Sequence, residues 1–370
     1  MKIECSVIWD NCDGSGTTWF FPRYCRLGDG SCFMTVQGIE ESDYYTPVCE
    51  SYFDGEKWSY PQVLDGFGWR LCRENIYEAF GDFVPYYHAP TDTVLMTAIN
   101  FYYKDGMLYD TLGDFCDTRV PDLKRYSAWS ARNNKGEWST ILEKIKIPGM
   151  DGSIYSCGCS QWVFKGDHDV YIPFSYGFID RRDRMVCVCR FYYDGKELRF
   201  IEKGNTLEFP CNRGLLEPSV IEFGGGFLMT VRTEDGKAYH SRSEDGLHWE
   251  SLEAWTFDDG NILETESTQQ HFLVCGQRIF LVYTRKTDYN TGMLRFRAPL
   301  FIAELNEKLE MIRDSEQIIF EYEDNGEGKS PGFGNFHIVT LDERQAIIGC
   351  TEERGYDSFR GKTLLARITL

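Results

Sequence analysis

The chain has 370 residues, of which 42% are hydrophobic and 26% are charged, and it carries a formal net charge of −19. This length supports a large buried core, and the acidic balance without dense basic patches argues against nucleic acid as a partner. No segment approaches a membrane-spanning apolar run, and the N-terminus lacks a cationic and apolar leader. We therefore expect a soluble, cytoplasmic protein with no membrane partner.

The numbers of cysteine and aromatic residues further narrow the class of protein. The 14 cysteines are too sparse for a disulfide scaffold, and many lie inside apolar, strand-like runs. We expect them to be reduced, buried thiols that pack as small apolar residues. The 22 Tyr, 26 Phe and 9 Trp favour strands and also offer flat faces on which sugars can stack.

Short apolar runs separated by Gly, Asp and Asn turns predict strands along most of the chain, whereas long helical periodicity is scarce. In chain order, the clearest runs are 2–8, 31–37, 93–102, 170–175, 227–232, 279–285, 337–341, 345–349 and 363–369. We expect segments 66–83 and 256–265 to form loops between larger units, where function often resides.

A recurring polar turn marks a degenerate repeat. Its clearest copies contain Asp-Gly, which tolerates positive φ and favours a tight hairpin. The copies centre on Asp54, Lys135, Asp194, Asp245 and Asn306, at steps of 81, 59, 51 and 61 residues. A four-stranded propeller blade takes roughly 40–60 residues.

The repeat predicts an all-β fold, a six-bladed β-propeller of four-stranded antiparallel blades, with seven blades as the alternative. The three C-terminal strands lack a fourth, and segment 2–8 can supply it and close the ring, which removes exposed sheet edges. We therefore expect residues 1–370 to form a single propeller domain.

The segment from Arg213 to Arg232 is the most informative for function. It places Glu217 before one predicted strand and Arg232 at the end of that strand, so that both side chains can point at one ligand. A guanidinium fork binds a carboxylate through two parallel hydrogen bonds. Arg213, Arg285 and Arg297 are expected to complete a substrate-binding cluster.

Several motifs together resemble the BNR-repeat, sialidase-like family of bacterial carbohydrate-degrading loci, over nearly the whole chain. They are Arg213-Gly-Leu-Leu-Glu-Pro-Ser219, the Asp-box turn Ser243-Glu-Asp-Gly-Leu-His-Trp249, Trp255-Thr-Phe-Asp-Asp-Gly260, Ser267-Thr-Gln-Gln-His271, Phe280-Leu-Val-Tyr-Thr-Arg285, Arg297-Ala-Pro-Leu-Phe-Ile-Ala303 and Gly334-Asn-Phe336. The resemblance implies a sialidase-like propeller that acts on carbohydrate.

Two motifs depart from the family pattern. Sialidases carry Arg-Ile-Pro near the start of the propeller, where this chain has Phe21-Pro22-Arg23. Relatives have Gly-His-Thr after the first central strand, where this chain has Ala98-Ile99-Asn100. If that histidine is catalytic in relatives, this protein has altered chemistry or none.

The resemblance also assigns roles. Glu217 matches the glutamate that activates a tyrosine nucleophile in sialidases, and Arg232 matches an arginine that binds the substrate carboxylate. Tyr283 is the best nucleophile candidate, because its i, i+2 spacing to Arg285 places both on one strand face.

The remaining site candidates are polar residues beside predicted strands. Gln270 and His271 end a polar approach to a strand, so we expect them to face the central funnel, with His271 as acid or base. His88 lies in an aromatic loop that suits a sugar site, where it would serve as acid or base or as a metal ligand, and Gln161 is a further substrate-binding candidate.

These residues support an exo-acting glycoside hydrolase that removes a terminal, acidic sugar from an oligosaccharide or glycan. Two alternatives remain open: a lyase acting on a uronic-acid linkage such as rhamnosyl-glucuronate, and a non-catalytic glycan-binding propeller. No metal-binding or cofactor-binding motif is present, so we expect no cofactor, although Asp258 and Asp259 leave a structural or substrate-bridging Ca²⁺ open.

Overall fold

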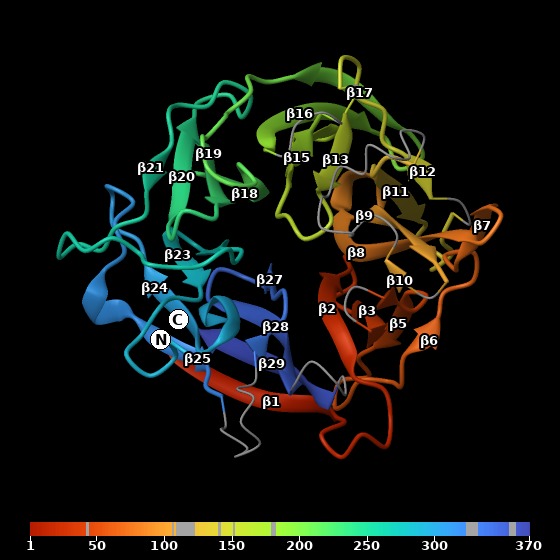
Figure 1. The fold of residues 1–370 in the computed structure, drawn as a ribbon, viewed down its shortest axis with the longest axis horizontal. Coiled ribbons are helices and arrows are strands. Elements are labelled where there is room, and N and C mark those ends of the chain that lie inside the picture. The colour runs from red at the N-terminus through yellow and green to blue at the C-terminus, as the bar shows by residue number, and fades with distance from the viewer. Residues whose placement is uncertain are drawn as a thin grey trace.

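Six antiparallel sheets stand around a central axis as the blades of a propeller (Figure 1). The computed structural model describes residues 1–41, 44–105, 107–108, 123–139, 142–150, 152–178, 183–322, 332–354 and 360–370. The arrangement confirms the predicted all-β, six-bladed propeller and excludes the seven-bladed alternative. Among the described residues, helix is confined to the 3-10 turns η1 (Ala89–Thr91), η2 (Leu294–Phe296) and η3 (Arg313–Ser315).

The first three blades each extend from an innermost strand at the axis to an outermost strand at the rim. Blade 1 contains β2 (Trp19–Arg26), β3 (Cys32–Glu41) with β4 (Tyr44–Tyr45), β5 (Cys49–Tyr52) and β6 (Gln62–Val63). Blade 2 contains β8 (Ile76–His88) with β7 (Arg70–Arg73), β9 (Thr93–Lys104) with β10 (Met107–Leu108), β11 (Ser127–Arg132) and β12 (Glu143–Lys144). Blade 3 contains β13 (Ser153–Ser156) and β14 (Val163–Lys165), then β15 (Asp169–Gly177), β16 (Met185–Tyr193) and β17 (Leu198–Lys203).

The other three blades follow the same plan. Blade 4 contains β18 (Leu216–Phe223), β19 (Gly226–Arg232), β20 (Ala238–Ser243) and β21 (Glu253–Ala254). Blade 5 contains β22 (His271–Cys275), β23 (Arg278–Tyr283), β24 (Leu300–Glu304) and β25 (Gln317–Phe320). Blade 6 contains β26 (Gly332–Phe333) and β27 (His337–Thr340), then β28 (Gln345–Arg354), β29 (Arg360–Thr369) and β1 (Lys2–Asp10).

The repeated polar turns occupy one equivalent position in five blades, between the third and fourth strands. In each, one side-chain oxygen accepts hydrogen bonds from two backbone N–H groups two to four residues further on. The acceptors are Asp54, Asn133, Asp194, Asp245 and Asn306. These Asx turns offer the backbone a local partner and fix the hairpin.

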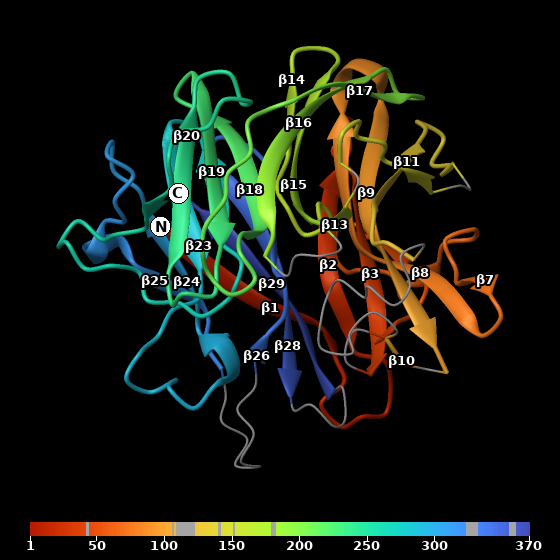
Figure 2. The same cartoon turned by 45° about the horizontal axis from the view of Figure 1, so that its top comes forward.

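Blade 6 lacks this turn because its fourth strand comes from the other end of the chain. β1 pairs antiparallel with β29, from Lys2 opposite Thr369 to Asp10 opposite Lys362. The two chain ends consequently lie side by side in both views (Figures 1 and 2). The six blades therefore contain only five of these repeated Asx turns.

Apolar side chains from facing blades fill the spaces between them. Trp255, Phe257 and Tyr283 belong to the core between blades 4 and 5. The predicted loop 256–265 does connect two blades. The prediction of a loop at 66–83 was wrong, because most of this segment forms a hairpin of β7 and the first half of β8. The hairpin turns at Glu74, whose φ angle is 38°.

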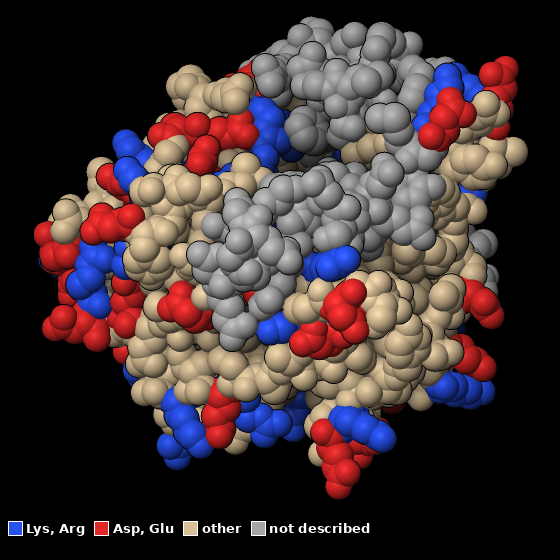
Figure 3. Space-filling view, turned by 60° about the horizontal axis from the view of Figure 1, so that its bottom comes forward, with Lys and Arg blue, Asp and Glu red and all other residues tan. Residues whose placement is uncertain are grey.

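Surface features agree with a protein of mixed charge. Acidic and basic side chains are interspersed on the described surface of the face in Figure 3.

The described cysteines are free thiols, most of them buried in strands or in the turns between them. In the part of the chain that the structure describes, no helix has the length and apolarity needed to cross a membrane.

The meander of each blade also orients the central channel. With four strands per blade, each inner strand begins at the same end of the ring as the one before it. We call this end the first mouth and the end where the inner strands finish the second mouth. Residues early in β18, such as Glu217, therefore lie at the first mouth, and residues late in β18 lie toward the second.

Candidate functional site

Several inner strands are interrupted near the first mouth, among them β2, β8 and β18. The register shifts between Phe20 and Arg23 in β2, between Gly81 and Val84 in β8, and between Leu216 and Ser219 in β18. Bulges of this kind re-aim side chains and are frequent beside active sites.

Positive φ angles accompany these interruptions and the loops beside them. The φ angle is 54° at Phe21, 54° at Asp82 and 45° at Glu217. It is also 45° at Ser267 and 56° at Arg295, in loops of blades 4 and 5. A non-glycine residue held in such a conformation costs about 1–3 kcal/mol, so its surroundings must over-determine it.

Glu217, Arg232 and Ser267 form the centre of this group. The Arg232 Nη1 donates to Glu217 Oε2 at 2.6 Å, and its Nε and Nη2 donate to Ser267 Oγ at 3.0 and 2.9 Å. Arg232 is only 5% exposed, whereas the Glu217 side chain is 20% exposed. The guanidinium is thus fixed in the protein while the carboxylate remains reachable from solvent.

A second ion pair extends the group on the same side. The Arg213 Nε donates to Glu234 Oε1 at 2.6 Å, and Ser267 Oγ donates to the same oxygen at 3.2 Å. Arg213 Nη2 also approaches Ser267 Oγ at 3.4 Å. Ser267, from the link between blades 4 and 5, therefore joins the two arginines into one network. Arg213 comes from the link between blades 3 and 4, and Glu234 comes from the turn after β19.

Arg295 and Arg297 add two further guanidiniums. Burial and the neighbouring charges of Arg232, Arg297 and Arg213 lower the pKa of Arg295 to about 10. The Arg297 Nη1 donates to the Phe333 carbonyl at 3.3 Å. We call Arg213, Arg232, Arg295 and Arg297 the arginine cluster. It faces the carboxylates of Glu217 and Glu234, so within this group of described residues the guanidiniums outnumber the carboxylates.

The cluster also determines the charge state of Glu217. Burial raises the pKa of this carboxyl, but the charges of Arg232, Arg297 and Arg213 outweigh burial and hold the pKa below its usual value. Glu217 is therefore ionised at neutral pH. It can accept a proton or orient a hydroxyl group, but it is not a proton donor.

A buried polar layer lies deeper in the channel. The Arg23 Nη1 donates to the Phe336 carbonyl at 2.8 Å, and its Nη2 lies 3.4 Å from Asp82 Oδ1. His271 Nδ1 lies 2.8 Å from Ser219 Oγ, and burial together with the Arg23 charge lowers the pKa of His271 to about 3. His271 is thus a buried, neutral imidazole beside Ser219, and its predicted role as acid or base stays a prediction.

Other predicted site residues lie apart from the arginine cluster. Tyr283 is fully buried between blades 4 and 5, where its hydroxyl donates to Glu316 at 2.5 Å. Arg285 donates to both oxygens of the same carboxylate, at 2.8 and 2.7 Å. His88 packs between blades 2 and 3 against Phe164, with Nδ1 2.7 Å from Thr91 Oγ1. The structure describes no contact between Glu217 and Tyr283, Arg285 or His88. The catalytic or substrate-binding roles of these three residues therefore stay predictions.

The two predicted glutamines satisfy backbone groups. Gln161 donates to the Phe272 carbonyl and accepts from its N–H, both at 2.7 Å, which joins blade 3 to blade 5 across the channel. Gln270 donates to the Thr268 carbonyl and is 1% exposed. Both side chains hold inner strands in place.

Sequence reasoning missed several residues of the site. Arg295, Glu234 and Ser267 belong to the network around Glu217, and Arg23 with Asp82 belongs to the buried layer. In the sequence, Arg23 was noted only because Phe21-Pro22-Arg23 stands where sialidases carry Arg-Ile-Pro. In the described part of the chain, no three His, Cys, Asp or Glu side chains cluster as metal ligands; the expectation of no cofactor stays a prediction.

Comparison with known proteins defines the fold. No protein-family model and no curated protein matches the sequence. A protein of unknown function from Dyadobacter fermentans DSM 18053 superposes with a TM-score of 0.63 at 14% identity, over 100% of this chain and 99% of that one. The Hadza microbial sialidase Hz136 gives a TM-score of 0.64 at 12% identity, over 99% of this chain and 68% of that one.

Two further sialidase structures agree. The intramolecular trans-sialidase from Ruminococcus gnavus, in complex with oseltamivir carboxylate, gives a TM-score of 0.59 at 12% identity, over 99% of this chain and 97% of that one. The Trypanosoma rangeli sialidase in complex with the inhibitor DANA gives 0.60 at 12% identity, over 95% of this chain and 55% of that one. The chain thus has the six-bladed, sialidase-like propeller fold.

Proposed function

We propose that this protein is an exo-acting, sialidase-like glycoside hydrolase that removes a terminal acidic sugar from a glycan. The observation that carries the proposal is the excess of positive charge at the first mouth, where burial and three neighbouring guanidiniums depress the pKa of Arg295. A ligand carboxylate relieves this repulsion and forms charge-assisted hydrogen bonds. The sialidase-like fold supports the same substrate class.

Glu217 supplies the chemistry in this proposal. Its carboxylate is ionised, partly exposed and fixed by Arg232 at 2.6 Å. With the sugar carboxylate held by the arginine cluster, Glu217 accepts the proton of the attacking water or hydroxyl as the bond to the anomeric carbon forms and the glycosidic bond breaks. The departing oxygen takes a proton from solvent, and Glu217 returns its proton there. The fixed guanidiniums also orient the sugar carboxylate without reorganisation.

A specific observation favours a second candidate, a non-catalytic glycan-binding propeller. The phenol expected to act as nucleophile, Tyr283, donates to Glu316 in a blade core, and His88 is held between other blades. Glycoside hydrolysis ordinarily uses two carboxyl groups or an equivalent pair. A binding protein needs only the arginine cluster.

One experiment separates these functions. Sialylated and uronic-acid-terminated oligosaccharides are incubated with the protein, and the products are analysed by mass spectrometry. Hydrolysis adds one water to the summed products, whereas a lyase adds none and creates an absorbing double bond. Binding by calorimetry without any product identifies the non-catalytic protein, and the absence of both binding and products overturns the proposal.

A further inference from the structure

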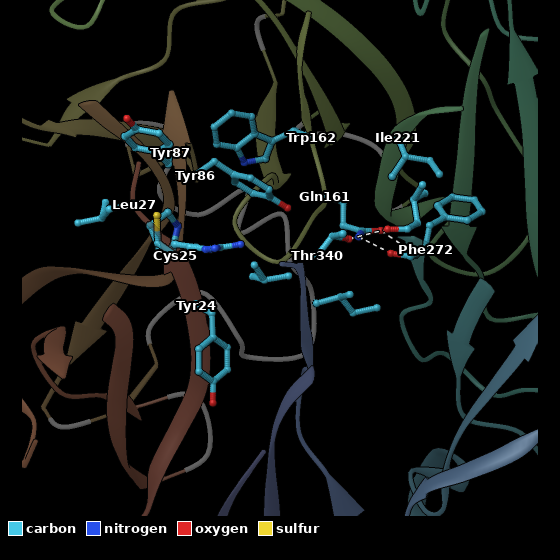
Figure 4. Close-up of a pocket in the computed structure, with 15 residues that line it drawn as sticks. Tyr24, Cys25, Leu27, Tyr86, Tyr87, Gln161, Trp162, Ile221, Phe272 and Thr340 are labelled. Atoms are coloured by element: carbon cyan, nitrogen blue, oxygen red, sulfur yellow. Dashed lines mark hydrogen bonds between the residues drawn. The ribbon is translucent and has the colours of Figure 1, made fainter. Parts of the chain in front are cut away.

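A cavity of about 490 Å³ opens at the second mouth of the channel, away from the arginine cluster (Figure 4). Its lining comes from the later parts of the inner strands, such as Arg26 at the end of β2, Ile221 in β18 and Val339 in β27. Tyr86 and Trp162 line it from blades 2 and 3. This volume lies within the range of small-molecule sites in proteins, about 300–1,000 Å³.

The buried polar layer separates the cavity from the first mouth. Arg23 and Ser219 are 0% exposed and His271 is 1% exposed, and each directly precedes, or lies near, a lining residue of the cavity in its own strand. Glu217 and Ile221 are four residues apart in β18, which corresponds to roughly 13 Å along the channel. The two mouths therefore carry separate sites.

The lining is aromatic and carries one charge type. The Tyr86 and Trp162 rings meet with centroids 4.4 Å apart at 54°, and Tyr87 and Phe272 add further aromatic surface. None of the 15 lining residues is Asp or Glu. Arg26 is exposed, and its Nη1 donates to the Leu341 carbonyl, which leaves its other nitrogens for a ligand. In a chain of net charge −19, a lining without carboxylates has the opposite character from the molecule as a whole.

Trp162 adds an unused hydrogen-bond donor. Its side chain is 3% exposed, and its Nε1 has no hydrogen-bond partner among the described residues. A buried indole N–H ordinarily finds a partner, and an unpaired donor costs about 1–3 kcal/mol. The accessible surface of Trp162 Nε1 is below 1 Å², so an accepting group on a bound molecule satisfies it only after the indole turns toward the cavity.

We propose that the cavity at the second mouth binds a small aromatic anion. The aromatic rings of the bound anion, fused or paired, pack against Tyr86 and the aliphatic side chains of Ile221 and Val339. An accepting atom receives the Trp162 N–H, and the acidic group lies toward Arg26. A free sugar fits the lining less well, because its many hydroxyls need more polar partners than these side chains provide.

The test uses anilinonaphthalene sulfonate as the probe and measures its binding by its fluorescence. N-phenylnaphthylamine serves as an uncharged analogue. The native protein is expected to bind one sulfonate probe saturably. Ile221→Trp fills the cavity and lowers affinity for both probes by about tenfold or more. Ile318→Trp, a matched change at an exposed outer-strand site that is 38% exposed, leaves both affinities unchanged.

Two milder variants test the polar contacts without threatening the fold. Trp162→Phe keeps an aromatic ring and weakens the sulfonate probe by about threefold to tenfold, as expected for one hydrogen bond. Arg26→Gln weakens the sulfonate but not the uncharged analogue. Equal binding by the native protein, Ile221→Trp and Arg26→Gln overturns the proposal, as does non-saturable binding.

Discussion

Glu217 and Arg232 face each other across the first hairpin of blade 4, with Oε2 and Nη1 2.6 Å apart and a separation of 15 positions in the sequence. The carboxylate stands at the start of the inner strand, and the guanidinium stands at the end of the next strand. The bulge between Leu216 and Ser219 turns Glu217 out of the ladder toward the channel mouth. The two groups can thus act on one bound anion.

Replacing Glu217 by Gln is expected to abolish turnover while preserving recognition. The amide keeps the shape but cannot accept a proton, so the rate of sugar release falls at least about 100-fold, the usual scale for loss of a general base. Affinity for the acidic sugar is retained or rises, because a negative charge has left the arginine cluster. Release assays and calorimetry check both; unchanged turnover contradicts the assignment.

Replacing Arg232 by Met is expected to weaken both binding and stability. The change leaves Glu217 and Ser267 without their main donor, so we expect a loss of about 1–3 kcal/mol in the free energy of unfolding. Affinity for the acidic sugar falls by about tenfold or more. Urea unfolding and calorimetry measure the two effects.

Arg285→Met provides the matched control. Arg285 also binds a carboxylate through two nitrogens, at Glu316, but it lies apart from the arginine cluster. Its loss is expected to lower stability by a similar amount while leaving sugar affinity unchanged. If both variants lose sugar affinity equally, the effect comes from general loosening of the propeller and not from the cluster.

Stability is expected to fall as the pH drops below about 6.5. His271 is neutral in the folded protein, with a pKa lowered to about 3, whereas an unfolded histidine binds a proton near pH 6.5. The unfolded state therefore holds more protons between these values, and stability rises with pH across that window. Between pH 7 and 5, His271 accounts for about 2 kcal/mol of the loss.

His271→Asn tests this linkage. Urea unfolding at pH 7 and 5 is expected to show a smaller difference in the variant than in the native protein. His337 has its pKa lowered in the same direction by burial and by the Arg23 charge, so part of the dependence remains. An identical pH dependence in the variant contradicts the buried neutral imidazole.

Gly214→Ala is expected to disturb the site through the backbone. An added Cβ lies 2.2 Å from the Arg184 carbonyl oxygen, where blades 3 and 4 meet, beside Arg213. We expect a loss of about 1–3 kcal/mol beyond the cost of positive φ, with reduced sugar affinity. Gly224→Ala is the control, since φ there is also positive, 62° against 70°, but nothing lies within 4 Å. Equal stability of both variants rules out the contact as the cause.

The fold was predictable because its signals are local. Each Asx turn needs only an Asp or Asn and the following few residues, so Asp54, Asp194 and Asn306 could be recognised without knowing their surroundings. The hairpin that joins Glu217 to Arg232 is also local. The loop predicted at 66–83 failed because the polar residues around Glu74 mark a turn within a protruding hairpin, which the composition does not distinguish from a longer loop.

The site was less predictable because it depends on conformation and on distant contacts. Arg295 reaches the cluster from a loop with φ 56°, which its sequence does not announce. Ser267 gains its role only because Arg213 and Arg232 both reach it. The spacing of Tyr283 and Arg285 indicated a shared strand face, and both residues bind Glu316. That carboxylate lies within blade 5, and no spacing rule distinguishes a strand face that looks into the channel from one that looks into a blade.

The pairing of β1 with β29 has a mechanical consequence. Lys2 stands opposite Thr369, so a force that pulls the two chain ends apart loads the first hydrogen bonds of the ladder one after another. A ladder loaded in this way peels open at low force, whereas one pulled along its length resists until many bonds break together. Stretching this protein by its ends would therefore open blade 6 first and convert the ring into an open arc before any other blade unravels.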